Sequence, residues 1–210
     1  VERPGRGDDL RHWLVDGISI HWKVYARNKK SITLNPRSAE GREILLRLVE
    51  GAQVLVENFL PGTLEKWQLG PDELLARNPA LVMVRVSGWG QTGPDRDQPG
   101  FGSLVEARSG FAAMNGFADR PPVLPPLALA DMVAGMYGGM ATLTALRQVE
   151  VCGGKGQVVD LPLFDPLLAI LGPQGAQFQL TGQGGTRTGS RSTTTAPRNT
   201  YQCKDGRYVE

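Results

Sequence analysis

The chain has 210 residues, a formal net charge of +2 and 40% hydrophobic residues, a balance that is typical of a soluble globular protein rather than a disordered one. The surplus of 23 basic over 21 acidic residues is too small to indicate nucleic acid as a partner. No apolar run reaches the roughly 18 residues of a membrane span, and Cys152 and Cys203 form no metal-binding spacing, so we expect no membrane, no metal and a reducing, cytoplasmic setting.

The first regular elements are a helix and a strand. Ser38, followed by Glu40 and apolar residues at helical spacing, predicts a capped amphipathic helix that ends at Gly51. Residues 53–58 form a short segment that contains the apolar run Val54-Leu55-Val56 with two β-branched residues, which predicts a buried parallel strand closed by the turn at 59–62.

A second helix and a second strand follow in the same order. Residues 71–77 predict the helix, and residues 81–86 predict a strand that ends in a glycine-rich loop at 87–90. This alternation predicts an α/β fold, with an open parallel sheet and flanking helices. Ligands of such sheets bind beyond the carboxyl ends of the strands, so we expect the functional residues on those loops.

The second half of the chain predicts three helices and one strand. Residues 103–110 predict a short helix within a stretch rich in Gly and Pro, and residues 157–161 predict a third strand. Pro162 is typical of the first turn of a following helix. A long helix from Asp131 to Gln148 is predicted by apolar side chains at helical spacing, namely Met132, Met136, Met140, Leu143 and Leu146.

The last 30 residues are expected to lie outside the packed domain. Residues 181–195 are mostly Gly, Ser, Thr and Arg, which are too polar to pack and predict a linker. Asp205-Gly206 predicts a turn with a strand just beginning after it. Because residue 1 is Val rather than Met and the chain stops in this strand, we expect a fragment of a longer protein.

Asp131 is the carboxylate that stands out, because it lies between an apolar approach and a glycine-containing helix. One interpretation is an N-cap, since an aspartate there would bind the unpaired N–H groups of the first turn and suit the helix dipole. The residues alone do not distinguish this structural role from a chemical one.

Six motifs follow one another in an order that resembles the class III CoA-transferase family. They are residues 56–62 (VENFLPG), 78–79 (NP), 86–94 (VSGWGQTGP), 109–110 (SG), 129–132 (LADM) and 156–161 (GQVVDL). The resemblance spans nearly the whole chain and matches the large-domain section of this family, which includes formyl-CoA transferases, carnitine CoA-transferases and α-methylacyl-CoA racemases.

This resemblance implies a Rossmann-like fold within a two-domain family of interlocked dimers, and therefore a homodimer. It implies a large CoA-binding domain at residues 1–180, with its first strand and helix missing before Val1. A linker at 181–200 and a truncated small domain beginning at 201–210 would follow.

The resemblance also implies an activity, the transfer of CoA from an acyl-CoA to a carboxylic acid without a metal. The family's nucleophilic aspartate matches Asp131, which would form a mixed anhydride with the acyl group and then an aspartyl-CoA thioester. The alternative from another functional class is a protein that binds CoA but catalyses no reaction. We keep this alternative because the flanking parts of the family fold are missing from the chain.

Several residues match family positions that contact CoA or lie beside such contacts. Asn58 follows a predicted parallel strand, although a turn-forming Asn is the alternative there. Basic side chains could bind the CoA phosphates or could simply be solvated. The matching and neighbouring positions are Arg3, Leu34, Arg37 and Lys66, with Lys29 and Lys30 as further candidates.

The chain departs from the family pattern at two positions, where Gly102 replaces a frequent Asp and Glu106 replaces a frequent Gln. The racemase members pair their aspartate with a histidine from the loop before Ser109, because racemisation needs a base on each face of the α-carbon. The histidines here are His12 and His21, so a transferase is favoured and a racemase is the alternative.

The tail after residue 186 resembles the subgroup that moves CoA between dicarboxylic acids, with succinyl-CoA as a common donor. Arg187, Arg191 and Arg198 could clamp a second carboxylate. A basic flexible linker is the alternative interpretation.

Overall fold

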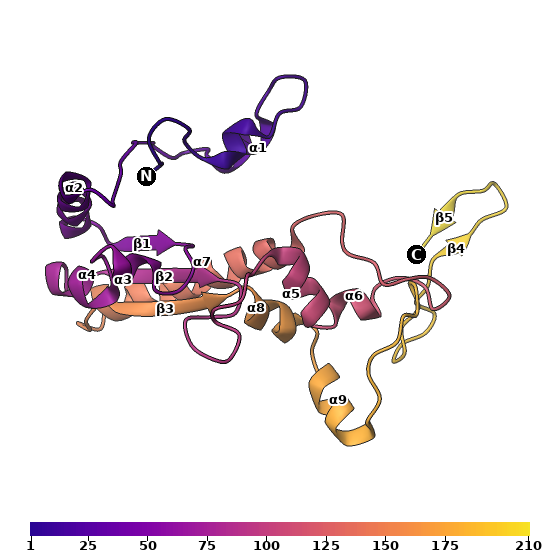
Figure 1. The fold of residues 1–210 in the computed structure, drawn as a ribbon. Helices are drawn as coiled ribbons and strands as arrows, with labels where there is room; N and C mark the ends of the chain where they lie inside the picture. The colour runs from indigo at the N-terminus through magenta and orange to yellow at the C-terminus, as the bar shows by residue number, and fades with distance from the viewer.

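A computed structural model describes all residues from 1 to 210. Its centre is a parallel three-stranded sheet in the order β1 (Val54–Glu57), β2 (Val82–Ser87) and β3 (Gln157–Pro162). Helices lie on both sides of this sheet (Figure 1). The predicted α/β class, with an open parallel sheet and flanking helices, is therefore confirmed.

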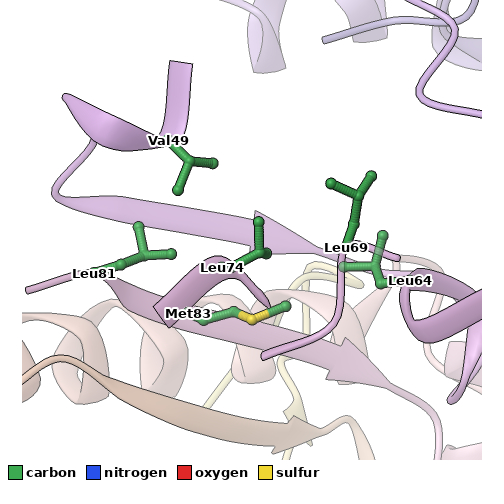
Figure 2. Close-up of a cluster of buried hydrophobic side chains, with 6 residues drawn as sticks. All are labelled: Val49, Leu64, Leu69, Leu74, Leu81 and Met83. Atoms are coloured by element: carbon green, nitrogen blue, oxygen red, sulfur yellow. The ribbon is translucent and has the colours of Figure 1, made fainter. Parts of the chain in front are cut away.

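The side chains around β2 alternate between two cores, as the two-residue period of a strand requires. Leu81 and Met83 belong to one cluster, which Figure 2 shows together with Val49, Leu64, Leu69 and Leu74. Val82 and Val84 belong to a second cluster on the opposite face. β2 is thus the buried strand that its β-branched sequence predicts, whereas β1 leaves Val56 66% exposed.

One face of the sheet is covered by α2 (Ala39–Glu50), α3 (Thr63–Lys66) and α4 (Pro71–Arg77). The predicted start of α2 is confirmed, because the Ser38 hydroxyl accepts a hydrogen bond from the Gly41 amide at 3.1 Å. Pro71 opens α4, where its missing N–H costs no helical hydrogen bond.

The other face is covered by α7 (Leu129–Glu150), but this helix does not pack through its largest side chains. Gly138 approaches β3 so closely that a Cβ there would lie 2.6 Å from Leu161. Gly138 and Ala145 therefore face the sheet, and of the predicted apolar residues Leu146 packs on the same cluster. The methionines at 132, 136 and 140 and Leu143 are exposed, so the apolar spacing predicted the helix correctly but did not identify its packed face.

Beyond the carboxyl edge of the sheet lie α5 (Gly102–Arg108), α6 (Phe111–Met114) and α8 (Phe164–Ile170) (Figure 1). The prediction that Pro162 opens the last of these helices is wrong. Pro162 pairs with Ser87 as the last residue of β3, and the Leu163 amide donates to the Ser87 carbonyl before α8 begins.

The two ends of the chain extend away from the sheet (Figure 1). Near the N-terminus are the short helices η1 (Asp9–His12) and α1 (Ile20–Tyr25), and after α8 comes α9 (Gln174–Thr181). Residues 182–200 contain no helix or strand, and β4 (Tyr201–Gln202) then pairs with β5 (Tyr208–Val209) in an antiparallel hairpin. No helix, α7 included, combines the length and apolar character needed to cross a membrane.

Candidate active site

The carboxyl edge of the sheet is connected to α5 by a close contact between two glycines. A Cβ on Gly88, in the loop after β2, would lie 2.5 Å from the Cα of Gly100. The indole N–H of Trp89 also donates to the Pro99 carbonyl at 3.1 Å. These contacts fix the beginning of α5 just beyond the end of β2, where an open α/β sheet places its ligands.

Asp131 lies against this beginning of α5. A Cβ on Gly102 would lie 2.4 Å from Oδ2 of Asp131, so the carboxylate rests against the glycine backbone. Asp131 is exposed, and its side chain forms no hydrogen bond or ion pair with the rest of the chain. The start of α7 thus presents an exposed carboxylate at the carboxyl edge of the sheet.

The N-cap interpretation of Asp131 is wrong. The helix begins at Leu129 with Ala128 at the N-cap position, which makes Asp131 the third helical residue. The first-turn amide of Ala130 instead donates to Oε1 of Glu106 on α5, at 3.1 Å. The carboxylate of Asp131 therefore has no capping task in the folded chain.

An ion-pair network built on a buried pair, Arg85 and Glu57, underlies the loop that carries Asn58. The Arg85 guanidinium contacts Oε1 of Glu57 at 2.7 Å and Oε1 of Glu65 at 2.6 Å. The other oxygen of Glu57 accepts a hydrogen bond from the Phe59 amide at 2.7 Å. Arg85 is 4% exposed and Glu57 6%, so the network fixes both sides of Asn58 from within the core.

Hydrogen bonding within this network changes the acidity of its members. Donation from Arg85 lowers the pKa of Glu65 below its ordinary value. For Arg85, burial opposes the charge, but donation to Glu65 and Glu57 outweighs it and raises the pKa. Both shifts favour the charged forms that the network needs.

An aromatic pair brings three of the predicted CoA contacts into one neighbourhood. Phe59 meets the ring of Trp67 edge-on, with 5.0 Å between the ring centres, and the Arg37 guanidinium lies 5.1 Å from the centre of the Trp67 ring. Asn58 and Lys66 are the chain neighbours of these two aromatic residues, and both are exposed. The Arg37 guanidinium therefore lies beside an aromatic pair whose chain neighbours are Asn58 and Lys66.

The remaining predicted contacts, Arg3 and Leu34, lie together on the N-terminal segment. The Leu34 amide donates to the Glu2 carbonyl at 2.9 Å, which places residues 2–3 beside residues 33–34. Arg3 is paired with Asp9 at 2.7 Å, although the guanidinium remains more than half exposed. The structure thus joins these two residues, but Arg3 already has a carboxylate partner.

The other basic candidates differ in what they contact. Lys29 donates to the Tyr25 carbonyl, whereas Lys30 is exposed without a partner. Arg187 donates to the carbonyls of Phe117 and Ala113, at 3.2 and 2.9 Å, so it ties the tail to α6. Arg191 and Arg198 are exposed, and their side chains form no hydrogen bond or ion pair.

Neither histidine contacts Asp131. The His12 ring nitrogen Nε2 lies 3.1 Å from the Arg6 carbonyl, and the His21 ring packs edge-on against Trp13. Both belong to the N-terminal segment, and no histidine occurs near Ser109. The histidine that the racemase members use near Ser109 therefore has no counterpart in residues 1–210.

Other features of the chain lie apart from these residues. A hollow of about 520 Å³ between α2 and α4 contains none of the predicted site residues, and its wall is formed by Arg42, Leu46, Gln68, Glu73, Ala76 and Arg77. No group of three or more His, Cys, Asp or Glu side chains lies close enough together to hold a metal ion.

A model of the family described as CoA-transferase family III matches residues 1–210 of the chain. The chain belongs to CoA-transferase family III. It is 46% identical over 209 residues to a succinyl-CoA–D-citramalate CoA-transferase of Chloroflexus aurantiacus, a match that covers 98% of this chain and 52% of that protein. It is 32% identical over 212 residues to the human succinyl-CoA:glutarate CoA-transferase, covering all of this chain and 48% of that protein.

Comparison with solved structures leads to the same family. A crystal structure of a CaiB/BaiF family protein from Brucella suis resembles the chain with a TM-score of 0.88 and 34% identity, covering 99% of this chain and 56% of that one. The chain spans about half the length of the curated relatives it matches. The family III assignment suggested by the six sequence motifs is therefore confirmed.

Proposed function

We propose that the full-length protein transfers CoA from succinyl-CoA or another acyl-CoA to a carboxylic acid, with Asp131 as the nucleophile. The observation that carries this proposal is the Asp131 carboxylate, which is exposed, unpaired and set against the backbone of Gly102 at the carboxyl edge of the sheet. Succinyl-CoA is named as the donor of several relatives, which supports it as the donor here.

The first half of the reaction loads CoA onto Asp131. A carboxylate oxygen attacks the thioester carbonyl, the C–S bond breaks, and a mixed anhydride and the CoA thiolate result. The thiolate then attacks the aspartyl carbonyl of the anhydride. This step releases the donor acid as its carboxylate and leaves an aspartyl-CoA thioester on the protein.

The second half runs in the opposite sense with the acceptor. The acceptor carboxylate attacks the aspartyl thioester and forms a new mixed anhydride, again releasing the CoA thiolate. Attack of the thiolate on the acyl carbon of the acceptor yields the new CoA ester and restores the Asp131 carboxylate. No proton, electron or metal is needed to balance either half.

For CoA binding, we assign Asn58, Arg37 and Lys66 around the Phe59–Trp67 pair, with Arg3 and Leu34 as further contacts. Cations bind the CoA phosphates by charge-assisted hydrogen bonds, and the amide of Asn58 can donate and accept. For Arg3 to contact CoA, its guanidinium must bind a phosphate in addition to Asp9 or break its ion pair with Asp9.

For the whole protein, we assign a cytoplasmic homodimer and a two-domain arrangement. Residues 1–180 form the large CoA-binding domain, 181–200 the linker and 201–210 the beginning of the small domain. Arg191 and Arg198 are the tail cations available to a second carboxylate of a dicarboxylic acceptor, because Arg187 is held by backbone carbonyls.

The test is an assay of the full-length protein with succinyl-CoA and a panel of dicarboxylic acids, with the new CoA ester detected by mass spectrometry. Asp131→Asn should lower the rate on the order of a thousandfold or more, at least about 4 kcal/mol of barrier. The matched control is Asp119→Asn, because Asp119 is exposed and contacts only Arg120, at 3.9 Å. Exchange of the α-proton of a 2-methylacyl-CoA without CoA transfer would identify a racemase instead, and CoA binding with neither reaction would identify a binding protein.

A further inference from the structure

The beginning of α7 is held by a side chain from another helix. The first amides of a helix have no intrahelical partner, and α7 has no side-chain cap at Ala128. The Ala130 amide, one residue before Asp131, donates to the Glu106 carboxylate at 3.1 Å. Glu106 is only 3% exposed, so this contact is made inside the protein.

The same helix that supplies Glu106 also contacts Asp131 itself. Gly102, one turn earlier on α5, lies against Oδ2 of Asp131, and residues four apart share one helix face. α5 therefore contacts the first turn of α7 twice, once at the Ala130 amide and once at the Asp131 carboxylate. A shift of this turn along α5 would change the direction in which the carboxylate points.

Apolar packing keeps the hydrogen bond of Glu106 away from water. Ala130, whose amide is the donor, and Val105, the chain neighbour of Glu106, are fully buried in one cluster with Ala134, Leu163 and Leu167. A buried amide that loses its acceptor is left without a hydrogen-bond partner, which destabilises the turn that contains it. The turn that carries Asp131 would then have to move or fray.

We propose that Glu106 is a positioning residue for Asp131, which it orients by accepting the hydrogen bond of the Ala130 amide. This proposal rests on the proposed function, in which Asp131 is the nucleophile. Glu106 does not touch the reacting atoms. Its role needs an acceptor oxygen at the right place rather than a negative charge, so glutamine should replace it and alanine should not.

The experiment follows the acylation of Asp131 in the full-length protein during a single turnover with succinyl-CoA, quenched with hydroxylamine. Glu106→Ala should slow formation of the Asp131 adduct by about tenfold to a hundredfold, the cost of a misplaced reacting group, while KM for succinyl-CoA changes less than about twofold. Glu106→Gln should remain within about threefold of the unmodified protein, because its amide oxygen can still accept. Glu73→Ala, an exposed carboxylate on α4, is the control.

Hydrogen exchange of the peptide that contains Ala130 gives a readout that is independent of activity. Exchange should be faster in Glu106→Ala and unchanged in Glu106→Gln. If Glu106→Ala does not fold, Glu106→Leu, which fills the space of the side chain without an oxygen acceptor, tests the same contact and should slow acylation by a similar factor.

The outcomes separate the two proposals. An adduct on Asp131 that forms equally fast in Glu106→Ala, or a Glu106→Gln variant as slow as the alanine variant, would overturn the positioning role alone. Absence of any Asp131 adduct in the unmodified protein would overturn the proposed function. A change confined to KM would assign Glu106 to substrate binding rather than to positioning.

Discussion

Glu57 and Arg85 stand opposite each other in the register of β1 and β2, and their side chains join at 2.7 Å in the interior. Each is at most 6% exposed, and Glu57 also accepts the Phe59 amide beyond Asn58. This pair therefore links the stability of the central strands to the shape of the loop assigned to CoA.

Replacement of Arg85 tests the energy of this network. Arg85→Met leaves Glu57 as an uncompensated buried charge, so we expect the free energy of unfolding of the full-length protein to fall by about 3–5 kcal/mol in urea titrations. The double variant Glu57→Gln, Arg85→Met should recover part of this loss, because glutamine carries no charge. Arg96→Met, which breaks only the exposed pair with Asp97, is the control, and a loss for Arg85→Met as small as for this control would contradict the account.

The pH dependence of stability follows from the lowered pKa of Glu65. The ordinary pKa of Glu65 is 4.5, and in the folded protein Glu65 stays ionised at pH values below this. The unfolded chain therefore binds the proton first as the pH falls. The stabilisation is fully present above pH 4.5 and is lost as the pH drops below it. Because the Glu65 side chain is 43% exposed, we expect this charge to contribute at most about 1 kcal/mol to the free energy of unfolding.

Glu65→Gln is the variant that measures this contribution. At pH 7 it should be less stable than the unmodified protein, and the difference in unfolding free energy should narrow as the pH is lowered further below 4.5. A difference that stays constant over this range would show that the Glu65 charge contributes nothing.

Asn58 is expected to contact CoA, because it is exposed beyond the end of β1 and shares its neighbourhood with Arg37 and Lys66. Asn58→Ala in the full-length protein should weaken CoA binding more than about twofold, or roughly 0.4 kcal/mol, in calorimetry. Gln177→Ala, on the exposed surface of α9, should leave the affinity unchanged. An Asn58→Ala affinity within twofold of the unmodified value would remove Asn58 from the CoA site.

The sequence predicted the elements whose local signals agree with their packing. Ser38 and Gly51 bound α2 as expected, Pro71 opens α4, and the apolar run ending at Val86 forms the central strand. The position of Asp131 beyond the sheet could also be predicted, because the order of helices and strands determines which ends of the elements meet.

The sequence could not predict contacts that depend on distant partners. The exposed methionines of α7 follow from how closely Gly138 approaches Leu161, which helical spacing does not encode. Pro162 completes β3 because the Leu163 amide bonds to Ser87. The role of Glu106 appears only when α5 packs on α7, whereas Arg85, a cation within an apolar strand, was a signal available in the sequence.

The most direct test of the central claim measures whether an oxygen atom of the acceptor acid is transferred to the carboxylate of Asp131. In the proposed reaction, attack by the acceptor carboxylate leaves one of its oxygens on the aspartate when the second anhydride is cleaved. The full-length protein is therefore incubated with succinyl-CoA and an acceptor acid labelled with heavy oxygen, and the tryptic peptide Ser109–Arg147, whose only acidic residues are Asp119 and Asp131, is sequenced by mass spectrometry. We predict that heavy oxygen accumulates on Asp131 and not on Asp119, and only when both substrates are present. Turnover that leaves Asp131 unlabelled would contradict its role as the nucleophile.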